Sequence, residues 1–153
     1  MKISKKGEYA LKALVELAIN HDKGVAVTLI NDIAERENIP PKYLEHILLS
    51  LKNAGILISK RGVGGGYSLN RPSEKISLGE IIRIVDGPLA PLNCVSTSAR
   101  ISCPDELYCG LYSVMLDVRN AIANIVDNIS LKDIAKKTHD LIERKQGVLN
   151  YAI

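Results

Sequence analysis

The sequence predicts a mainly α fold with one small β-hairpin, and three observations support this prediction. Two short amphipathic stretches meet at a proline turn near residue 40, and a glycine-rich hairpin follows the second stretch directly. Farther on, apolar residues recur at intervals of three and four within residues 104–145. The first two features are typical of a winged helix-turn-helix, and the third is typical of a long dimerisation helix.

The first two helices are predicted from periodicity and capping. Residues 4–20 carry apolar side chains at helical spacing, with charged side chains on the opposite face. The sequence after Asn20 ends this helix at Gly24. Thr28 is expected to cap a second helix that ends near Glu37, because its hydroxyl can accept a hydrogen bond from a free first-turn amide.

Pro40 and Pro41 predict a tight turn into a third helix, since proline fits the first helical turn but disfavours helix before it. This helix should end near Ala54, with Gly55 as a left-handed cap. Its inward face is apolar. Its outward face presents polar residues suited to base edges in a major groove, namely Lys42, Glu45, His46 and Ser50. A merely solvated helix face is the alternative.

Two β-prone runs flank the glycines at 62 and 64–66, which predicts a hairpin, or wing, beside the third helix. Lys60 and Arg61 lie next to these glycines, where the backbone can approach a phosphate or a narrow minor groove. The glycines match neither a phosphate-binding loop nor a dinucleotide fingerprint. We therefore predict that residues 1–86 form a winged helix-turn-helix DNA-binding domain, although a tight hairpin without DNA contact fits the same pattern.

The remaining chain is predicted to carry a loop and two further helices. A capping box at Ser77 and Glu80 starts a helix to Asp86, and residues 87–109 form a cysteine-bearing loop. Pro104 is expected to open a long helix, and Ser130 starts a final helix to about Lys145, followed by a tail over 146–153. The helices within 104–145 are predicted to form a homodimer through a seam of Leu111, Met115, Val118, Ile122, Ile125 and Ile129.

Charge and composition narrow the class of protein. Residues 1–86 carry 13 Lys/Arg and 10 Asp/Glu, whereas residues 87–153 carry seven of each, so the net charge of +3 comes from the predicted DNA-binding half. We expect a cytoplasmic protein with no membrane association, because neither a leader nor a membrane-length apolar run is present. The three histidines lie on different elements without a nucleophile beside them, so no enzyme activity is expected.

Cys94, Cys103 and Cys109 are separated by eight and five residues. Zinc sites usually place cysteines two to four residues apart, so the spacing is a poor zinc pattern. Iron–sulfur clusters tolerate wider gaps, and Cys109, on the first turns of the helix expected from Pro104, would be favoured as a thiolate by the positive end of the helix dipole. Buried or redox-active thiols remain the alternative, and a disulfide framework is not expected from three cysteines in a reducing compartment.

Several motifs together resemble the Rrf family of bacterial regulators, the IscR-like proteins, over residues 1 to about 135. They are the opening at 1–10, Tyr43-Leu44-Glu45, the wing at 61–67, and three cysteines before a long helix. The resemblance implies a homodimer on pseudo-palindromic promoter DNA and a 2Fe-2S or 4Fe-4S cluster held by the cysteines. It places Lys42, Tyr43, Glu45 and His46 at the recognition helix and Arg61 in the minor groove. The position of Lys60 and Gly64 in the wing adds these two residues to the predicted DNA contacts.

Two features depart from that family pattern. The first cysteine gap is eight residues rather than five, and Tyr112 stands where a histidine ligand is usual. Some relatives take a carboxylate from the partner's first helix, and Glu8 is at the matching position, which makes it the candidate fourth ligand. The predicted function is a transcription regulator that senses cluster supply, iron, nitric oxide or redox state. A cluster-free thiol regulator and an iron–sulfur carrier are the alternatives.

Overall fold

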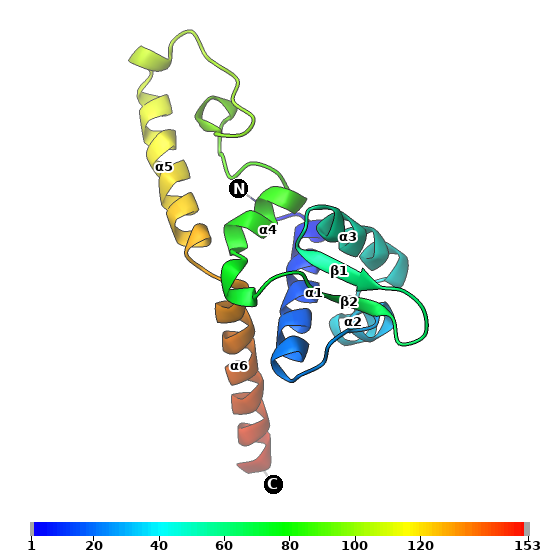
Figure 1. The fold of residues 1–153 in the computed structure, drawn as a ribbon. Coiled ribbons are helices and arrows are strands. Elements are labelled where there is room, and N and C mark those ends of the chain that lie inside the picture. The colour runs from blue at the N-terminus through cyan, green and yellow to red at the C-terminus, as the bar shows by residue number, and fades with distance from the viewer. Residues whose placement is uncertain (1, 152–153) are drawn as a thin grey trace.

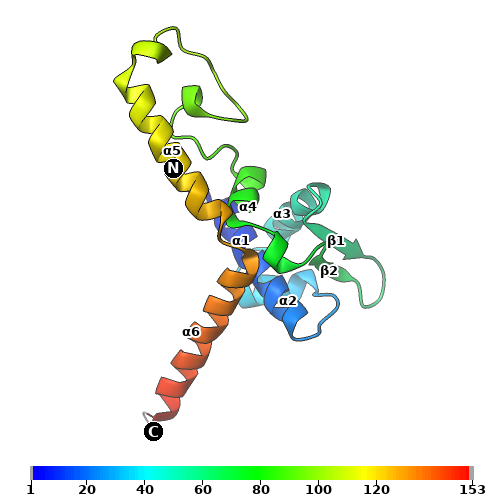
Figure 2. The same ribbon diagram turned by 60° about the vertical axis from the view of Figure 1, so that its left-hand side comes forward.

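The computed structural model describes residues 2–151 and confirms a mainly helical protein with a single two-stranded hairpin in that range (Figure 1). Three helices and the hairpin form one lobe. The last two helices run end to end along its side, and the cysteine loop lies next to the upper one. Figure 2 shows the same two helices as one bent rod, with the far end of the second projecting away from the lobe.

The helix-turn-helix consists of α2 (Ile30–Glu37) and α3 (Pro41–Asn53), and both helices pack against α1 (Lys5–Asp22). Ser4 caps α1 by accepting a hydrogen bond from the Gly7 N–H, and Gly55 adopts the predicted left-handed conformation after α3. The expected Thr28 cap is wrong. The Thr28 hydroxyl accepts from the buried Asn20 amide, and its backbone pairs with Tyr67, so α2 begins after Leu29 without a side-chain cap.

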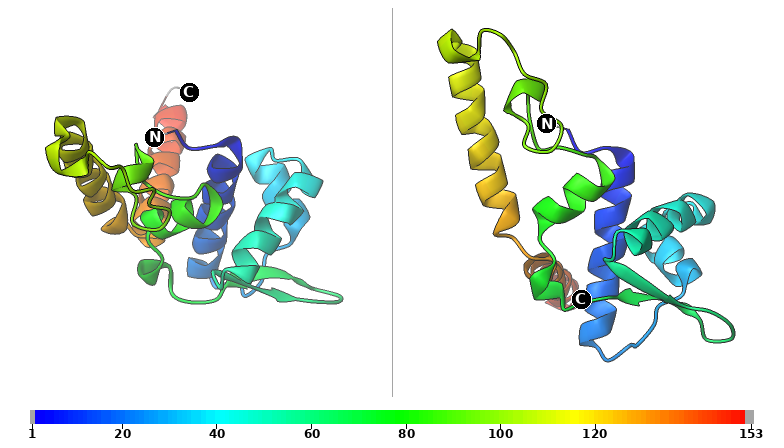
Figure 3. Two further views of the ribbon diagram at one scale, coloured as in Figure 1. Left: turned by 90° about the horizontal axis from the view of Figure 1, so that it is seen from above. Right: turned by 45° about the horizontal axis from the view of Figure 1, so that its top comes forward.

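The wing is formed by β1 (Leu57–Lys60) and β2 (Gly66–Leu69), which pair antiparallel with Leu57 opposite Leu69 and Lys60 opposite Gly66. Thr28 and Tyr67 exchange two backbone hydrogen bonds of 2.9 Å, and these attach the start of β2 to the segment before α2. The left view of Figure 3 shows the hairpin extending outward beyond the helices. The wing is thus held at the start of β2, next to the turn at residues 61–65.

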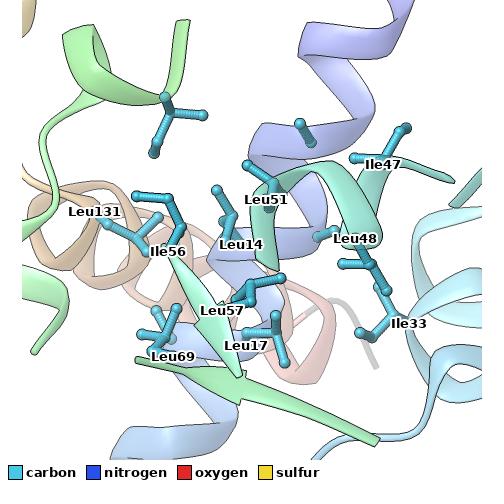
Figure 4. Packing of buried hydrophobic residues seen from close by; sticks show 14 of the residues in the cluster. Leu14, Leu17, Ile33, Ile47, Leu48, Leu51, Ile56, Leu57, Leu69 and Leu131 are labelled. Atoms are coloured by element: carbon cyan, nitrogen blue, oxygen red, sulfur yellow. The ribbon is translucent and has the colours of Figure 1, made fainter. Parts of the chain in front are cut away.

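One aliphatic core holds α1, α2, α3 and the wing together, as Figure 4 shows. Leu14, Ile47 and Leu51 are fully buried, each from the apolar face that the sequence pattern predicts. Ile56 and Leu57 close the core from the wing. Leu131, from the start of the last helix, completes it, so a residue distant in sequence is part of the domain core.

The segment after the wing contains η1 (Ser73–Lys75) and α4 (Leu78–Val85), and the Ser77 hydroxyl accepts from the Glu80 N–H as predicted. The cysteine loop carries two short 3-10 turns, η2 (Asn93–Val95) and η3 (Glu106–Tyr108). The predicted helix start at Pro104 is wrong. Cys109 has extended backbone angles and caps α5 (Gly110–Asp127), so the chain from Pro104 forms turns rather than a first helical stretch.

The final helix, α6 (Leu131–Tyr151), begins at the predicted capping box, where Ser130 and Asp133 each accept from the other's backbone N–H. Two predictions fail here. Ile129 lies in the connection between α5 and α6, and its carbonyl accepts from the Leu78 N–H. Residues 146–151, predicted as a tail, continue α6, while 152–153 lie outside the described residues.

Within residues 2–151, none of the helices combines the length and apolar character that a membrane span requires.

Candidate DNA interface and cysteine loop

A groove of about 610 Å³ lies between the outer face of α3, the start of α2 and the wing. Lys42, Glu45, Leu49 and Lys52 from α3 form one wall, and Ser59, Lys60, Arg61 and the wing glycines form the other. Asn31 and its neighbours at the start of α2 contribute the third side. The groove therefore joins the predicted recognition helix to the predicted wing.

The charge of this groove suits a polyanion. Its lining side chains include the cations Lys42, Lys52, Lys60 and Arg61 and a single carboxylate, that of Glu45. Cations at the rim favour phosphate contacts, while a carboxylate in their midst can accept a hydrogen bond from a cytosine amino group. This combination can both hold a nucleic-acid backbone and discriminate between bases.

The structure gathers some predicted DNA-contact residues and separates others. Lys42, Glu45, Lys60 and Arg61 line the groove, whereas Tyr43 and His46 occupy the neighbouring face of α3. The Tyr43 ring instead packs edge-to-face on Tyr9, with ring centroids 5.8 Å apart. Gly64 lies outside the groove lining, in the wing tip at φ 72°.

Sequence reasoning missed Leu49 and Lys52. They follow Lys42 and Glu45 at intervals of four and three, so all four share one face of α3. Counting that spacing from Lys42 would have found them. Asn31 gives no comparable signal, because only the fold brings the start of α2 beside α3.

Two wing glycines are required by close packing. A Cβ on Gly65 would lie 2.4 Å from the Lys60 carbonyl oxygen. On Gly66, with φ 154°, a Cβ would lie 2.3 Å from the Thr28 carbonyl oxygen. Both neighbours are backbone atoms that cannot turn away, so these glycines fix the position of Lys60 and Arg61 beside α3.

The three cysteines are free thiols on one loop that leads into α5. Cys94 is half-buried in η2, Cys103 is exposed, and Cys109 is half-buried at the cap of α5. The Cys109 sulfur accepts a hydrogen bond of 3.4 Å from the Tyr112 N–H. Three thiols, which are soft donors of the kind that bind iron, therefore lie within one segment.

Protein contacts also order this loop. The Ile101 N–H donates to the Asn93 carbonyl, and Arg100 pairs with Glu106. The Cys103 N–H donates to the Glu106 carboxylate and, together with Arg100, holds the pKa of Glu106 below its ordinary value. The loop thus has a defined path beside α5, which the right view of Figure 3 shows.

Glu8 lies in the first turn of α1, between Lys5 at 2.8 Å and Lys12 at 3.3 Å. Hydrogen bonds from these lysines lower the pKa of Glu8, so this exposed side chain remains an ionised carboxylate. Ser4, one turn earlier, donates both its N–H and its hydroxyl to Asp86, the residue just before the cysteine loop. The start of α1 is therefore tied directly to the start of the loop.

The predicted seam divides between two faces of α5. Leu111, Val118 and Ile125 are exposed, together with Val114. Met115 is half-buried, and Ile122 packs inward against a small core formed by Ile82, Leu89 and Val126. An apolar stripe thus remains uncovered along the outer face of α5.

Residues 3–137 match the profile of Rrf2, described as an iron-dependent transcriptional regulator family. The chain belongs to the Rrf2 family. It is accordingly a DNA-binding transcription regulator, and the family resemblance found in the sequence is confirmed.

The Rrf2 relatives are similar over nearly the whole chain. A putative rrf2-like regulator of Rhodobacter capsulatus is 42% identical over 137 residues, covering 86% of this chain and 91% of its own. The structure of CymR, the global cysteine regulator of B. subtilis, aligns with TM-score 0.73 and 33% identity, covering 90% of this chain and 98% of CymR. T. potens IscR aligns with TM-score 0.71 and 31% identity, covering 90% and 88%. Both structures support the winged-helix fold.

Proposed function

We propose that this Rrf2 regulator binds pseudo-palindromic promoter DNA as a homodimer and that its cysteine loop holds an iron–sulfur cluster whose state sets DNA affinity. The observation that carries the proposal is the position of the cysteines. Three free thiols lie on the one segment that joins the DNA-binding domain to α5. A change in ligation of these cysteines would therefore affect the DNA-binding domain and α5 together.

In the proposed complex, α3 enters the major groove and the wing follows the adjacent backbone. Lys42 and Glu45 face the base edges, and Arg61 enters the minor groove with Lys60 on a phosphate. The exposed apolar stripe of α5 packs on the same stripe of a second copy. Two recognition helices held by this contact require two half-sites of opposite direction, which makes the operator pseudo-palindromic.

For the cluster, Cys94, Cys103 and Cys109 supply three thiolates, and Glu8 of a second copy supplies a carboxylate as the fourth ligand. A bound cluster would provide chemistry that oxygen, nitric oxide or iron shortage can alter. The Ser4–Asp86 hydrogen bonds support the coupling, because they attach α1, and with it the domain core, to the first residue before the loop. Loss of ligation would disorder residues 87–109 and loosen the two DNA-binding domains, an order-to-disorder switch.

The cluster is tested by purifying the protein without oxygen and measuring iron, acid-labile sulfide and the visible absorption spectrum. We expect both elements at stoichiometric levels and their loss in Cys94→Ala, Cys103→Ala and Cys109→Ala. DNA affinity is then measured before and after exposure to oxygen or nitric oxide. Iron-free protein with unchanged DNA affinity would refute the cluster.

Glu8 as fourth ligand is tested separately. Glu8→Ala should change the absorption spectrum and shorten the lifetime of the cluster in air. Lys12→Met is the matched control, since it removes an ion pair of Glu8 but retains the carboxylate. If Glu8→Ala behaves like the control, the fourth ligand is another group.

A thiol-based regulator without a cluster is the second candidate, favoured by the exposure of Cys103 and by the similarity to the cysteine regulator CymR. It predicts iron-free protein whose DNA affinity responds to a thiol oxidant and recovers with a thiol reductant. Cys103→Ser would abolish that response. An iron–sulfur carrier, the remaining alternative, would contain a cluster but show no preference for promoter sequence.

The DNA interface is tested by mobility shift at several salt concentrations. Arg61→Ala should weaken binding at every salt concentration and flatten the dependence on salt, because fewer counterions are released. Lys75→Ala is the control, since Lys75 is an exposed cation in η1 outside the groove. Equal effects of the two variants would show that the wing makes no specific contact.

A further inference from the structure

Arg119, half-buried on the inner face of α5, forms no ion pair with the residues that the structure describes. Its Nε atom is buried and has no hydrogen-bond partner within residues 2–151. The residues one turn away along α5 are Met115, Leu116, Ile122 and Ala123, so the helix offers no carboxylate beside it. A buried guanidinium nitrogen without a partner is costly, and it indicates that something else binds there.

A small cavity adjoins this guanidinium. It lies between the end of α4, residues 88–98 and α5, and has a volume of about 20 Å³. Its polar lining consists of Arg83, Ser96, Thr97, Ser98 and Arg119. A site of this volume suits one water molecule or one monatomic ion rather than a polyatomic ligand such as sulfate.

The polar groups around the cavity favour a hydrogen-bond acceptor. Ser96 is only 4% exposed, and its hydroxyl oxygen accepts from the Ala99 N–H at 3.0 Å, which leaves its own proton to donate. Arg119 can only donate. Both groups therefore require an acceptor atom in the cavity.

The charge balance favours an anion over water. Arg83 makes two hydrogen bonds to Asp127, of 2.6 and 2.9 Å, and these lower the pKa of Asp127 and cancel the charge of Arg83. Arg119 has no such partner, and none of the described residues that line the cavity is acidic. Water could accept the Nε hydrogen bond, whereas an anion would accept it and also balance the Arg119 charge.

We propose that this cavity binds a small monovalent anion of halide size, held by Arg119 and the Ser96 hydroxyl. The anion fixes residues 88–98, the first part of the cysteine loop, against α5. The site needs neither cluster nor DNA, so it goes beyond the proposed function and can fail or stand independently of it.

The first test follows thermal unfolding of the full-length protein in sodium chloride and in sodium gluconate at equal concentrations. We expect chloride to raise the Tm in a saturable way that gluconate, too large for the cavity, does not reproduce. Arg119→Met should lose this response. Arg100→Met is the control, since Arg100 is an exposed loop arginine paired with Glu106, and it should retain the response.

The second test locates the ion. Crystals grown in sodium bromide should show an anomalous peak within hydrogen-bonding distance of the Arg119 Nε and none in Arg119→Met. If that variant fails to fold, Ser96→Ala serves instead and should require a higher halide concentration for the same Tm rise. An ordered water in the cavity, or the same Tm response in Arg119→Met, would overturn the proposal. A Tm response that does not saturate would also overturn it and would indicate an adventitious ion only.

Discussion

Gly7→Ala should destabilise the protein, although alanine normally favours a helix. Gly7 lies in the first turn of α1, and a Cβ there would lie 2.5 Å from the Asp86 Oδ2 and 2.9 Å from the Ile3 Cγ2. The Asp86 carboxylate would have to move, and it accepts the Ser4 N–H at 2.8 Å and the Ser4 hydroxyl. The substitution therefore breaks the link between α1 and the start of the cysteine loop.

The two opposing terms can be compared. Replacing glycine by alanine within a helix gains about 1 kcal/mol. Losing two hydrogen bonds to a charged acceptor at a partly exposed site costs about 1–1.5 kcal/mol each. We expect a net loss of about 1–2 kcal/mol in the free energy of unfolding, measured by urea denaturation followed by circular dichroism at one protein concentration.

A double-mutant cycle makes this prediction sharp. With Asp86→Ala the main obstacle is gone, so adding Gly7→Ala should be neutral or stabilising by up to about 1 kcal/mol. Gly110→Ala, with no atoms within 4 Å of the added Cβ, is the control and should not destabilise. A Gly7→Ala variant as stable as the natural protein, or the same loss in both backgrounds, would refute the reasoning.

Three further predictions concern the domain core and the wing. Arg36→Leu leaves the Glu16 carboxylate, whose side chain is 9% exposed, without its ion pair. Because Arg36 itself is 59% exposed, we expect the free energy of unfolding to fall by only about 1–3 kcal/mol in urea denaturation. An unchanged free energy of unfolding would contradict a structural role for the pair. Burial, and then the charge of Glu16, raise the pKa of Glu37, so Glu37→Gln should stabilise the protein at neutral pH. The gain in free energy of unfolding should shrink as the pH falls through the raised pKa toward the ordinary glutamate value. A gain that grew in acid would contradict the raised pKa. Gly66→Ala should abolish DNA binding in a mobility shift, whereas Gly64→Ala, where an added Cβ meets open space, should retain more affinity. Tighter DNA binding by Gly66→Ala than by Gly64→Ala would contradict the close approach of Gly66 to the Thr28 backbone.

The sequence allowed the DNA-binding lobe to be predicted closely, because its signals are local. Periodicity placed the buried faces of α1 and α3, and Pro41 and Gly55 marked the bounds of α3 to within a residue or two. The predictions that failed depend on contacts with distant segments. Thr28 caps no helix because its backbone pairs with Tyr67 in the wing, and Pro104 starts no helix because Glu106 binds the backbone of Cys103 and Cys109 caps α5.

The candidate sites show the same division. Residue types and spacing sufficed to nominate Lys42, Glu45 and Arg61, but only folding placed Asn31 in the same groove and turned Tyr43 toward Tyr9. The Arg119 cavity has no sequence signal at all, since its walls come from three separate segments.

What the sequence by itself determined is the set of helices, the wing and the family, because helical periodicity, capping and turn chemistry act over a few residues. What only the tertiary structure decided is which side chains meet across segments. Asp86 binds Ser4 over 82 positions, and Leu131 completes a core built by residues far before it. Such contacts depend on the packing of whole elements, which no local pattern encodes.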